Sequence, residues 1–185
     1  MRHLNSGVLR TMALLAEEIV EEWLNREGYF TIRGIKLGVH EIDFLAVKSK
    51  GPNNTECRHL EVQASMRPVS YISHVPKQLQ RAGRSANSAK RTPQELREGV
   101  EELVWKKFEM PAKLALMQSL WGGTWTRELV VNVVKSEEEV TLIQSHGVSV
   151  IRLKDILSSL KRSGSIIQRA CGADFIDLIQ FEGPA

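Results

Sequence analysis

Two apolar segments joined by a polar turn decide the fold: EIDFLAV at residues 41–47, SKGPNNTE at 49–56 and RHLEVQAS at 58–65. The Gly, Pro and Asn residues of the middle segment favour a turn, so the flanking segments predict a β-hairpin. Side chains alternate along a strand, and Asp43 falls in a strand that is apolar on both faces. A buried carboxylate is costly unless it is paired or holds a cation. Asp43 is therefore the first candidate for a functional residue.

The second strand of this hairpin carries two further polar candidates. Glu61 and Gln63 point to one face and can converge with Asp43 on one cation. Mg²⁺ prefers oxygen ligands, usually one or two carboxylates with waters and a substrate phosphate. Asp43, Glu61 and the backbone carbonyl of Val62 supply such a set, and Gln63 would orient the attacking water that the ion acidifies. The same side chains also suit a solvated hairpin face, and the pattern alone leaves both interpretations open.

The stretch GVHEIDFLAV…HLEVQAS, which begins at Gly38, resembles the strand–turn–strand core of the PD-(D/E)xK nucleases, the restriction-endonuclease-like superfamily. The resemblance places Asp43 at the family's Asp, Glu61 at its acidic position and Gln63 where Lys usually stands. It implies an Mg²⁺- or Mn²⁺-dependent endonuclease that hydrolyses phosphodiester bonds in DNA. Two positions depart from the motif: Ile42 replaces Pro, and Gln63 removes the cationic partner of the attacking water, although some active members have Gln or Glu there.

The preceding segment predicts an amphipathic helix over residues 12–27 that ends at Gly28. Glu22 falls on its polar side, whereas Glu17 lies at the edge of the buried stripe. The first helix of the superfamily often carries a glutamate that reaches the metal site, and the spacing from Glu17 to Gly28 resembles that of archaeal Holliday-junction resolvases. The resemblance therefore makes Glu17 a candidate catalytic residue. The alternative is that Glu17 is one more solvated acid.

The order of elements favours an α/β fold. The strand–helix–strand unit at 128–153 implies parallel neighbours and a right-handed crossover. The whole order resembles a restriction-endonuclease-like three-layer core, with a central mixed sheet of about four to five strands between helices. We expect one domain over 1–185, with a core over about 12–153, a helical insertion at about 92–121 and C-terminal helices over 155–181. The predicted strands are 29–34, 41–48, 58–64, 128–134 and 148–153, and the predicted helices are 12–27, 75–82, 94–108, 110–120, 137–146, 155–162 and 166–179.

A basic segment follows the hairpin. Acidic residues are absent from Val62 to Gln94. Positive side chains next to a metal site can contact the phosphates of the nucleic-acid backbone. Such contacts supply most of the affinity for nucleic acid. A solvated basic loop is the alternative. The candidate DNA-binding residues are Arg67, Lys77, Arg81, Arg84, Lys90 and Arg91. Trp105, Trp121 and Trp125 could stack on bases, but aromatic residues at such spacings favour a core position, which we expect for them.

Composition bounds the remaining questions. The chain has 185 residues, of which 42% are hydrophobic and 25% charged, as in an ordinary globular protein. It has no run of about 18 apolar residues, which argues against a membrane span. Cys57 and Cys171 lie far apart without metal-ligand spacing, so we expect reduced thiols and a cytoplasmic location.

Three functional hypotheses follow. The first is the metal-dependent DNA endonuclease. The second is a nuclease-fold DNA-binding or assembly module without catalysis, which the absence of the motif Lys at Gln63 supports. The third is an α/β interaction protein without a nucleic-acid partner. A homodimer is expected only by analogy with relatives that cut two strands.

Overall fold

The computed structural model describes residues 6–64, 71–161 and 167. Arg67 and most of the helix predicted at 166–179 lie outside these residues. The elements, in chain order, are α1 (Ser6–Arg26), β1 (Phe30–Leu37), β2 (His40–Gly51), β3 (Asn54–Gln63), α2 (Lys77–Arg81), α3 (Pro93–Val104), the π-helical turn η1 (Trp105–Glu109), α4 (Pro111–Leu120), β4 (Trp125–Val131), α5 (Glu137–Ser145), β5 (Ser149–Arg152) and α6 (Leu153–Leu160).

The strands form one mixed five-stranded sheet in the order β1-β2-β3-β4-β5, which confirms the predicted α/β class. β1, β2 and β3 pair antiparallel, while β3, β4 and β5 pair parallel. The polar turn does join β2 to β3, and Asn53 adopts a positive φ of 59° there, which Asn tolerates better than most residues. The hairpin thus fixes the register that sets Phe44 opposite Leu60 and Leu45 opposite His59.

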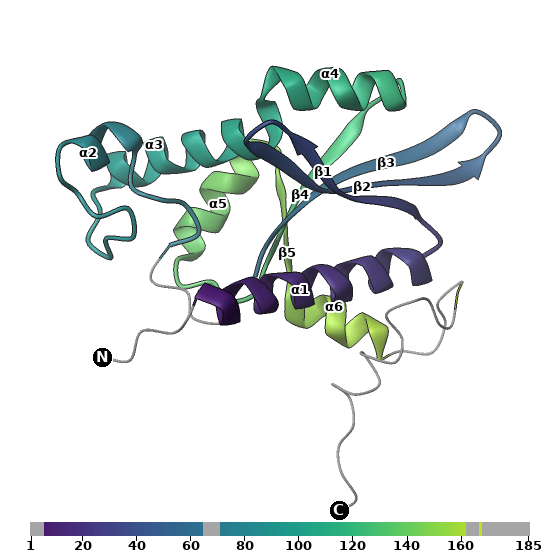
Figure 1. The fold of residues 1–185 in the computed structure, drawn as a ribbon, viewed down its shortest axis with the longest axis horizontal. Coiled ribbons are helices and arrows are strands. Elements are labelled where there is room, and N and C mark those ends of the chain that lie inside the picture. Colours follow the sequence, from purple (N-terminus) through teal and green to yellow (C-terminus); the bar gives the residue numbers. More distant parts are fainter. Residues whose placement is uncertain (1–5, 65–70, 162–166, 168–185) are drawn as a thin grey trace, which may run out of the picture.

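Helices cover both faces of the sheet, as Figure 1 shows. On one face, α1 and α6 pack over a core that includes Phe44, Leu60 and Val130. On the other, α3, η1 and α5 pack over a core that includes Leu129 and Val131. Because both faces are covered, the central strands are apolar on both sides. The arrangement is consistent with the predicted three layers.

The helix ends follow local sequence signals. Gly28 has a φ of 84° just after α1, and Thr92 caps α3 through a reciprocal pair of hydrogen bonds with Glu95. The helix predicted at 94–108 is interrupted, because α3 passes into the π-helical turn at Trp105. Such a turn accommodates an extra residue and often occurs at functional sites.

Three side chains lie in places that the sequence analysis did not predict. Glu22 is fully buried rather than on a polar face, and its carboxylate accepts a hydrogen bond of 2.6 Å from Arg26 Nε. The core placement of Trp105 and Trp121 is wrong, since they are 51% and 46% exposed. Helical spacing cannot reveal these outcomes, because the partner that buries or exposes a side chain belongs to the tertiary structure.

Candidate active site

Asp43 and Glu61 meet on one face of the β2–β3 hairpin. The register sets Leu45 opposite His59, so the side chains two positions further along, Asp43 and Glu61, share that face. The backbone amide of Val62 donates a 2.7 Å hydrogen bond to Asp43 Oδ2. The structure therefore brings together the two carboxylates that the sequence analysis singled out.

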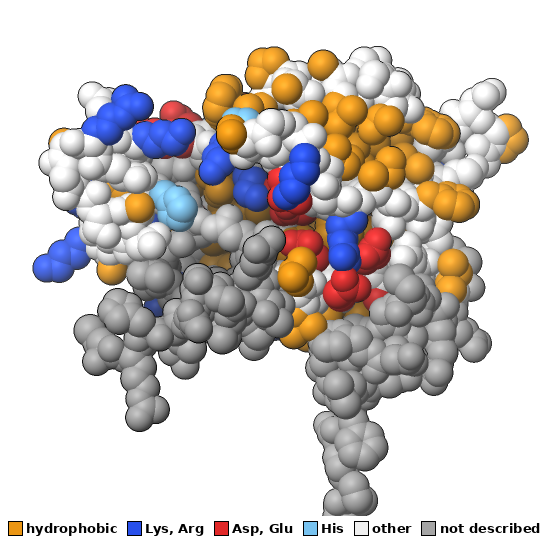
Figure 2. Space-filling view, in the orientation of Figure 1, with side chains coloured by type: hydrophobic (Ala, Val, Ile, Leu, Met, Phe, Trp, Pro, Cys, Tyr) orange, Lys and Arg blue, Asp and Glu red, His pale blue; other side chains and the backbone are white. Residues whose placement is uncertain are grey.

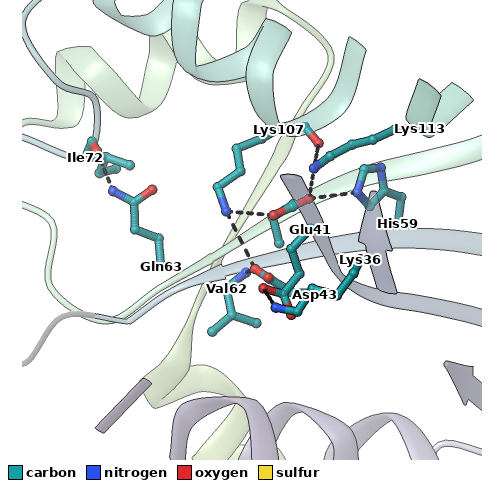
Figure 3. A network of polar contacts seen from close by, with 10 residues as sticks. Lys36, Glu41, Asp43, His59, Val62, Gln63, Ile72, Lys107 and Lys113 are labelled. Atoms are coloured by element: carbon teal, nitrogen blue, oxygen red, sulfur yellow. Dashed lines mark hydrogen bonds and ion pairs between the residues drawn. The ribbon is translucent and has the colours of Figure 1, made fainter. Parts of the chain in front are cut away.

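Glu61 is held by three nitrogen groups, which belong to Lys107, Lys113 and His59, the residues labelled in Figure 3. Its side chain is 0% exposed. Lys107 Nζ lies 2.7 Å from Oε2, and Lys113 Nζ lies 2.5 Å from Oε1. His59 Nε2 lies 3.1 Å from Oε1, with its ring edge against Phe108. Both carboxylate oxygens are thus compensated, as a buried charge requires.

Lys107 is the group that joins the two acids. It belongs to η1, and its Nζ lies 3.7 Å from Asp43 Oδ2 while it bonds Glu61. Lys113 Nζ also donates a 2.8 Å hydrogen bond to the carbonyl of Lys107, which ties α4 to η1. The side chain of Lys113 is 2% exposed, whereas those of Lys107 and Asp43 are 24% and 14% exposed. Lys107 and Asp43 therefore form the part of the cluster that solvent can reach.

Burial and neighbouring charges drive the two carboxyl pKa values apart. Burial, and then the charge of Glu61, raise the pKa of Asp43 to about 7, against the opposing effect of Lys107. Burial alone would also raise the pKa of Glu61, but the hydrogen bond from His59 and the charges of Lys107 and Lys113 lower it to about 2. Glu61 is therefore ionised near neutral pH, whereas Asp43 keeps its proton to a much higher pH than an ordinary aspartate.

The remaining ionisable groups of the cluster are also perturbed. The attraction of Glu61 and Asp43 outweighs burial and raises the pKa of Lys107, so this side chain stays charged. Burial lowers the pKa of His59 despite the nearby Glu61, which favours a neutral ring that donates from Nε2. Among the described residues, His59 Nδ1 is a buried polar atom without a hydrogen-bond partner.

Gln63 and Glu17 lie apart from this cluster. The Nε2 atom of Gln63 donates a 2.5 Å hydrogen bond to the carbonyl of Ile72, and Figure 3 shows this amide turned toward Ile72 and away from Asp43. Glu17 is half-buried. Burial raises the pKa of its carboxyl group, with a smaller contribution from the charge of Glu41, against the opposing charge of Arg33. Neither side chain has a hydrogen bond or ion pair to Asp43 or Glu61 among the contacts of the described residues.

Lys107 and Lys113 were missed by the sequence analysis. They lie 46 and 52 residues from Glu61 along the chain, and no local pattern links them to the hairpin. The sequence could have indicated that cations from elsewhere in the chain are needed, because a fully buried acid requires compensating charge and Gln63 supplies none. Which lysines compensate the charge of Glu61 is decided by the packing of η1 and α4 on the sheet.

The carboxylate pair suits a hard divalent cation in its donor chemistry. Asp43 and Glu61 supply oxygen ligands of the type and number that Mg²⁺ uses when waters and a substrate phosphate complete its shell. Burial, and then the charge of Glu61, raise the pKa of Asp43, and a dication bound there would oppose both effects. Throughout the described ranges, no three His, Cys, Asp or Glu side chains gather closely enough to hold a metal ion. A metal site here would therefore rest on two carboxylates, and Lys107 would have to leave its present contacts with them.

The predicted DNA-binding residues divide into two groups. Lys77, Arg81 and Lys90 are exposed, and Figure 2 shows Lys and Arg side chains on the part of the surface over α2 and α3. Arg84 is also exposed, but its guanidinium pairs with Glu95 at 2.9 Å. Arg91 is half-buried, and its guanidinium donates to Ser73 and lies over the ring of Tyr71. Two of the five described residues are thus already engaged by the fold.

A comparison with protein-family models gives no match, and a comparison with curated proteins gives none either. The resemblance of the hairpin to the PD-(D/E)xK nucleases therefore stays a prediction. Within the described ranges, no helix combines the length and apolar character needed to cross a bilayer.

Proposed function

We propose that this chain is a metal-dependent DNA endonuclease whose active site is formed by Asp43, Glu61 and Lys107. The observation that carries the proposal is the convergence of two acids and a lysine, from segments distant in sequence, at a partly exposed position on the sheet. Strongly perturbed carboxyl pKa values at such a position are typical of functional sites. Lys107 supplies the cation that Gln63 does not.

The roles follow from the contacts. Asp43 and Glu61 would hold Mg²⁺ or Mn²⁺, which supplies charge stabilisation of the phosphate and acidification of a bound water. His59 and Lys113 fix the orientation of Glu61 from its buried side. The ammonium group of Lys107, which is the more exposed of the two lysines, would then face the phosphate or orient the attacking water. Glu17 and Gln63 have no assigned step in this proposal.

Phosphate contacts by Lys77, Arg81 and Lys90 would hold the DNA backbone, since these exposed side chains follow the hairpin in the chain. Affinity for DNA should then fall steeply with salt. Replacing Arg81 with Ala should lower the slope of log K against log salt by roughly one. An affinity that does not change with salt would contradict this part of the proposal.

The second candidate is a nuclease-fold module that binds DNA without cutting it. The observation in its favour is the complete engagement of Glu61, whose two oxygens are already bonded by lysines. In this case the cluster is a structural ion network. The two candidates differ in one respect that can be measured: only the endonuclease needs the carboxylates to exchange a lysine for a divalent cation.

Cleavage of supercoiled plasmid, linear duplex and branched DNA tests the proposal, with Mg²⁺ or Mn²⁺ present or chelated. We expect metal-dependent cleavage by the wild type, none by Asp43→Ala, and a loss of about 10²–10³-fold in kcat for Lys107→Met, the range seen when a preorganised stabilising group is removed. Lys154→Met is the control, because Lys154 is exposed on α6, across the sheet from the site.

The outcomes separate the candidates. Cleavage that requires metal, Asp43 and Lys107 but not Lys154 supports the endonuclease. Salt-sensitive binding by wild type and Asp43→Ala without any cleavage favours the silent module. Absence of both binding and cleavage would contradict both and leave the interaction protein as the remaining hypothesis.

A further inference from the structure

A cavity of about 660 Å³ adjoins the candidate active site. Lys107 and Gln63 form part of its wall, so the same lysine that bonds Glu61 also faces this space. The volume lies within the range of about 300–1,000 Å³ that is usual for small-molecule sites. A phosphodiester placed at Asp43 and Lys107 would therefore have the cavity next to it.

The lining combines apolar, aromatic and amide groups with charged ones, which are three lysines and the two acids Glu101 and Glu102. Ile72 and Leu103 contribute apolar surface, and Trp105 contributes an indole that is half exposed. Gln63 and Gln80 contribute amide groups, each fixed by a hydrogen bond from its Nε2 to a backbone carbonyl. An aromatic face together with preset amides is what recognises a nucleobase, which stacks through its plane and pairs through its edge.

The shape of the cavity depends on a close contact of the backbone. Gly99 in α3 lines the cavity, and a Cβ built on it would lie 2.5 Å from the carbonyl oxygen of His74. α3 can therefore approach the segment at His74 only because residue 99 has no side chain. This contact holds the wall that carries Trp105 close to the segment that follows β3.

We propose that this cavity receives an unstacked nucleobase of the strand whose phosphate lies at Asp43, Glu61 and Lys107. The inference rests on the proposed function and names its substrate class: a single-stranded or locally unpaired region of nucleic acid. Trp105 stacks on the base, and Lys77, which also lines the cavity, faces the neighbouring phosphate. A base can enter such a cavity only after it leaves the helical stack.

Binding of single-stranded oligodeoxynucleotides in the presence of EDTA tests the inference without any cleavage. Alanine substitution of a stacking aromatic residue weakens binding by about 5- to 150-fold, and we expect this loss for Trp105→Ala. Trp121→Ala is the matched control, because Trp121 has similar exposure but does not line the cavity. Trp105→Phe, which keeps an aromatic face, should recover most of the affinity.

An oligonucleotide with abasic sites at every position separates stacking from charge, because it keeps the phosphates and lacks the bases. Trp105→Ala should bind this strand as the wild type does. A strand containing 2-aminopurine should lose fluorescence on binding to the wild type and less on binding to Trp105→Ala. Equal affinity of wild type and Trp105→Ala for the normal strand, or an equal loss for the abasic strand, would overturn the base pocket.

The failure of this inference can be told apart from failure of the endonuclease. Metal-dependent cleavage with binding that is indifferent to Trp105 would remove the pocket and keep the active site. Binding that depends on Trp105 and on the bases, without cleavage under any metal condition, would keep the pocket and remove the nuclease.

Discussion

Replacing Asp43 with Asn should stabilise the metal-free protein, and the gain should grow with pH. Asn keeps the size of the side chain and an oxygen that can accept the hydrogen bond from the Val62 amide. It removes a carboxyl group whose charged form is opposed by burial and by the charge of Glu61. Asp43→Asn therefore isolates the electrostatic cost of this carboxylate.

The magnitude follows from the pKa of Asp43, which is about 7 in the folded protein and about 3.9 in an unfolded chain. Because the folded value is raised, the contribution of Asp43 to stability is complete below the unfolded pKa and is lost as pH rises through the folded pKa. A difference of about three pK units corresponds to a loss of about 4 kcal/mol above pH 7. Relaxation of the site can only reduce this value, so it is an upper bound.

Equilibrium unfolding in urea with EDTA, followed from about pH 4 to about pH 8, measures this effect. The gain of Asp43→Asn over wild type should be near zero at the acidic end, increase through the interval and level off above pH 7. Glu61 stays ionised in both proteins over this window because its pKa is about 2. It therefore contributes no slope to the difference.

Two results would refute this reasoning. A gain that is independent of pH would mean that Asp43 is not the titrating group. A loss of stability at pH 8 would mean that the contact of Asp43 with Lys107 outweighs burial and repulsion. Addition of Mg²⁺ supplies an independent readout, since a ligand that binds only the folded state raises its stability. We expect Mg²⁺ to stabilise the wild type at pH 8 and to have little effect on Asp43→Asn.

Two further predictions concern the support of the site. Lys113→Met should destabilise the protein by about 3–5 kcal/mol in urea unfolding, because it removes a buried partner from the fully buried Glu61; unchanged stability would show that Lys113 does not compensate this charge. Gly99→Ala should lower stability by about 1–3 kcal/mol, since its Cβ would meet the carbonyl oxygen of His74 at 2.5 Å. Gly122→Ala is the control because only a side-chain atom at 3.6 Å lies near its Cβ, and equal thermal unfolding of the two variants would contradict a steric cost at residue 99.

The α/β class could be predicted because it depends on local patterns. Period-two alternation, apolar strands and the Gly, Pro and Asn turn indicated the hairpin, and the strand–helix–strand unit near the C-terminus indicated parallel strands. The caps at Gly28 and Thr92 also depend on nearby residues only. Small differences remain at element ends, for example in β1, which extends to Leu37.

The charged core could not be predicted in the same way. Arg58 forms a buried pair with Glu128 and lies over the rings of Trp23 and Tyr29, which belong to α1 and the turn after it. Glu139 accepts hydrogen bonds from the backbone of residues 72–73, far away along the chain. In each case the sequence shows an ordinary charged residue, and only long-range packing makes it buried and paired.

The candidate site also combines features that the sequence predicts with features that only the packing decides. The sequence by itself determined the hairpin and the alternation of side chains along each strand. The register that brings Asp43 and Glu61 together includes an irregularity between Ser49 and Gly51, which the structure shows. Only the tertiary structure decided which cations face them. Lys107 and Lys113 reach Glu61 because α3 passes through a π-helical turn into α4 over this face of the sheet, whereas Gln63, the nearer residue in sequence, bonds Ile72 instead. A position two residues away along a strand is set by covalent geometry, but a partner some 50 residues away is set by how helices pack on the sheet.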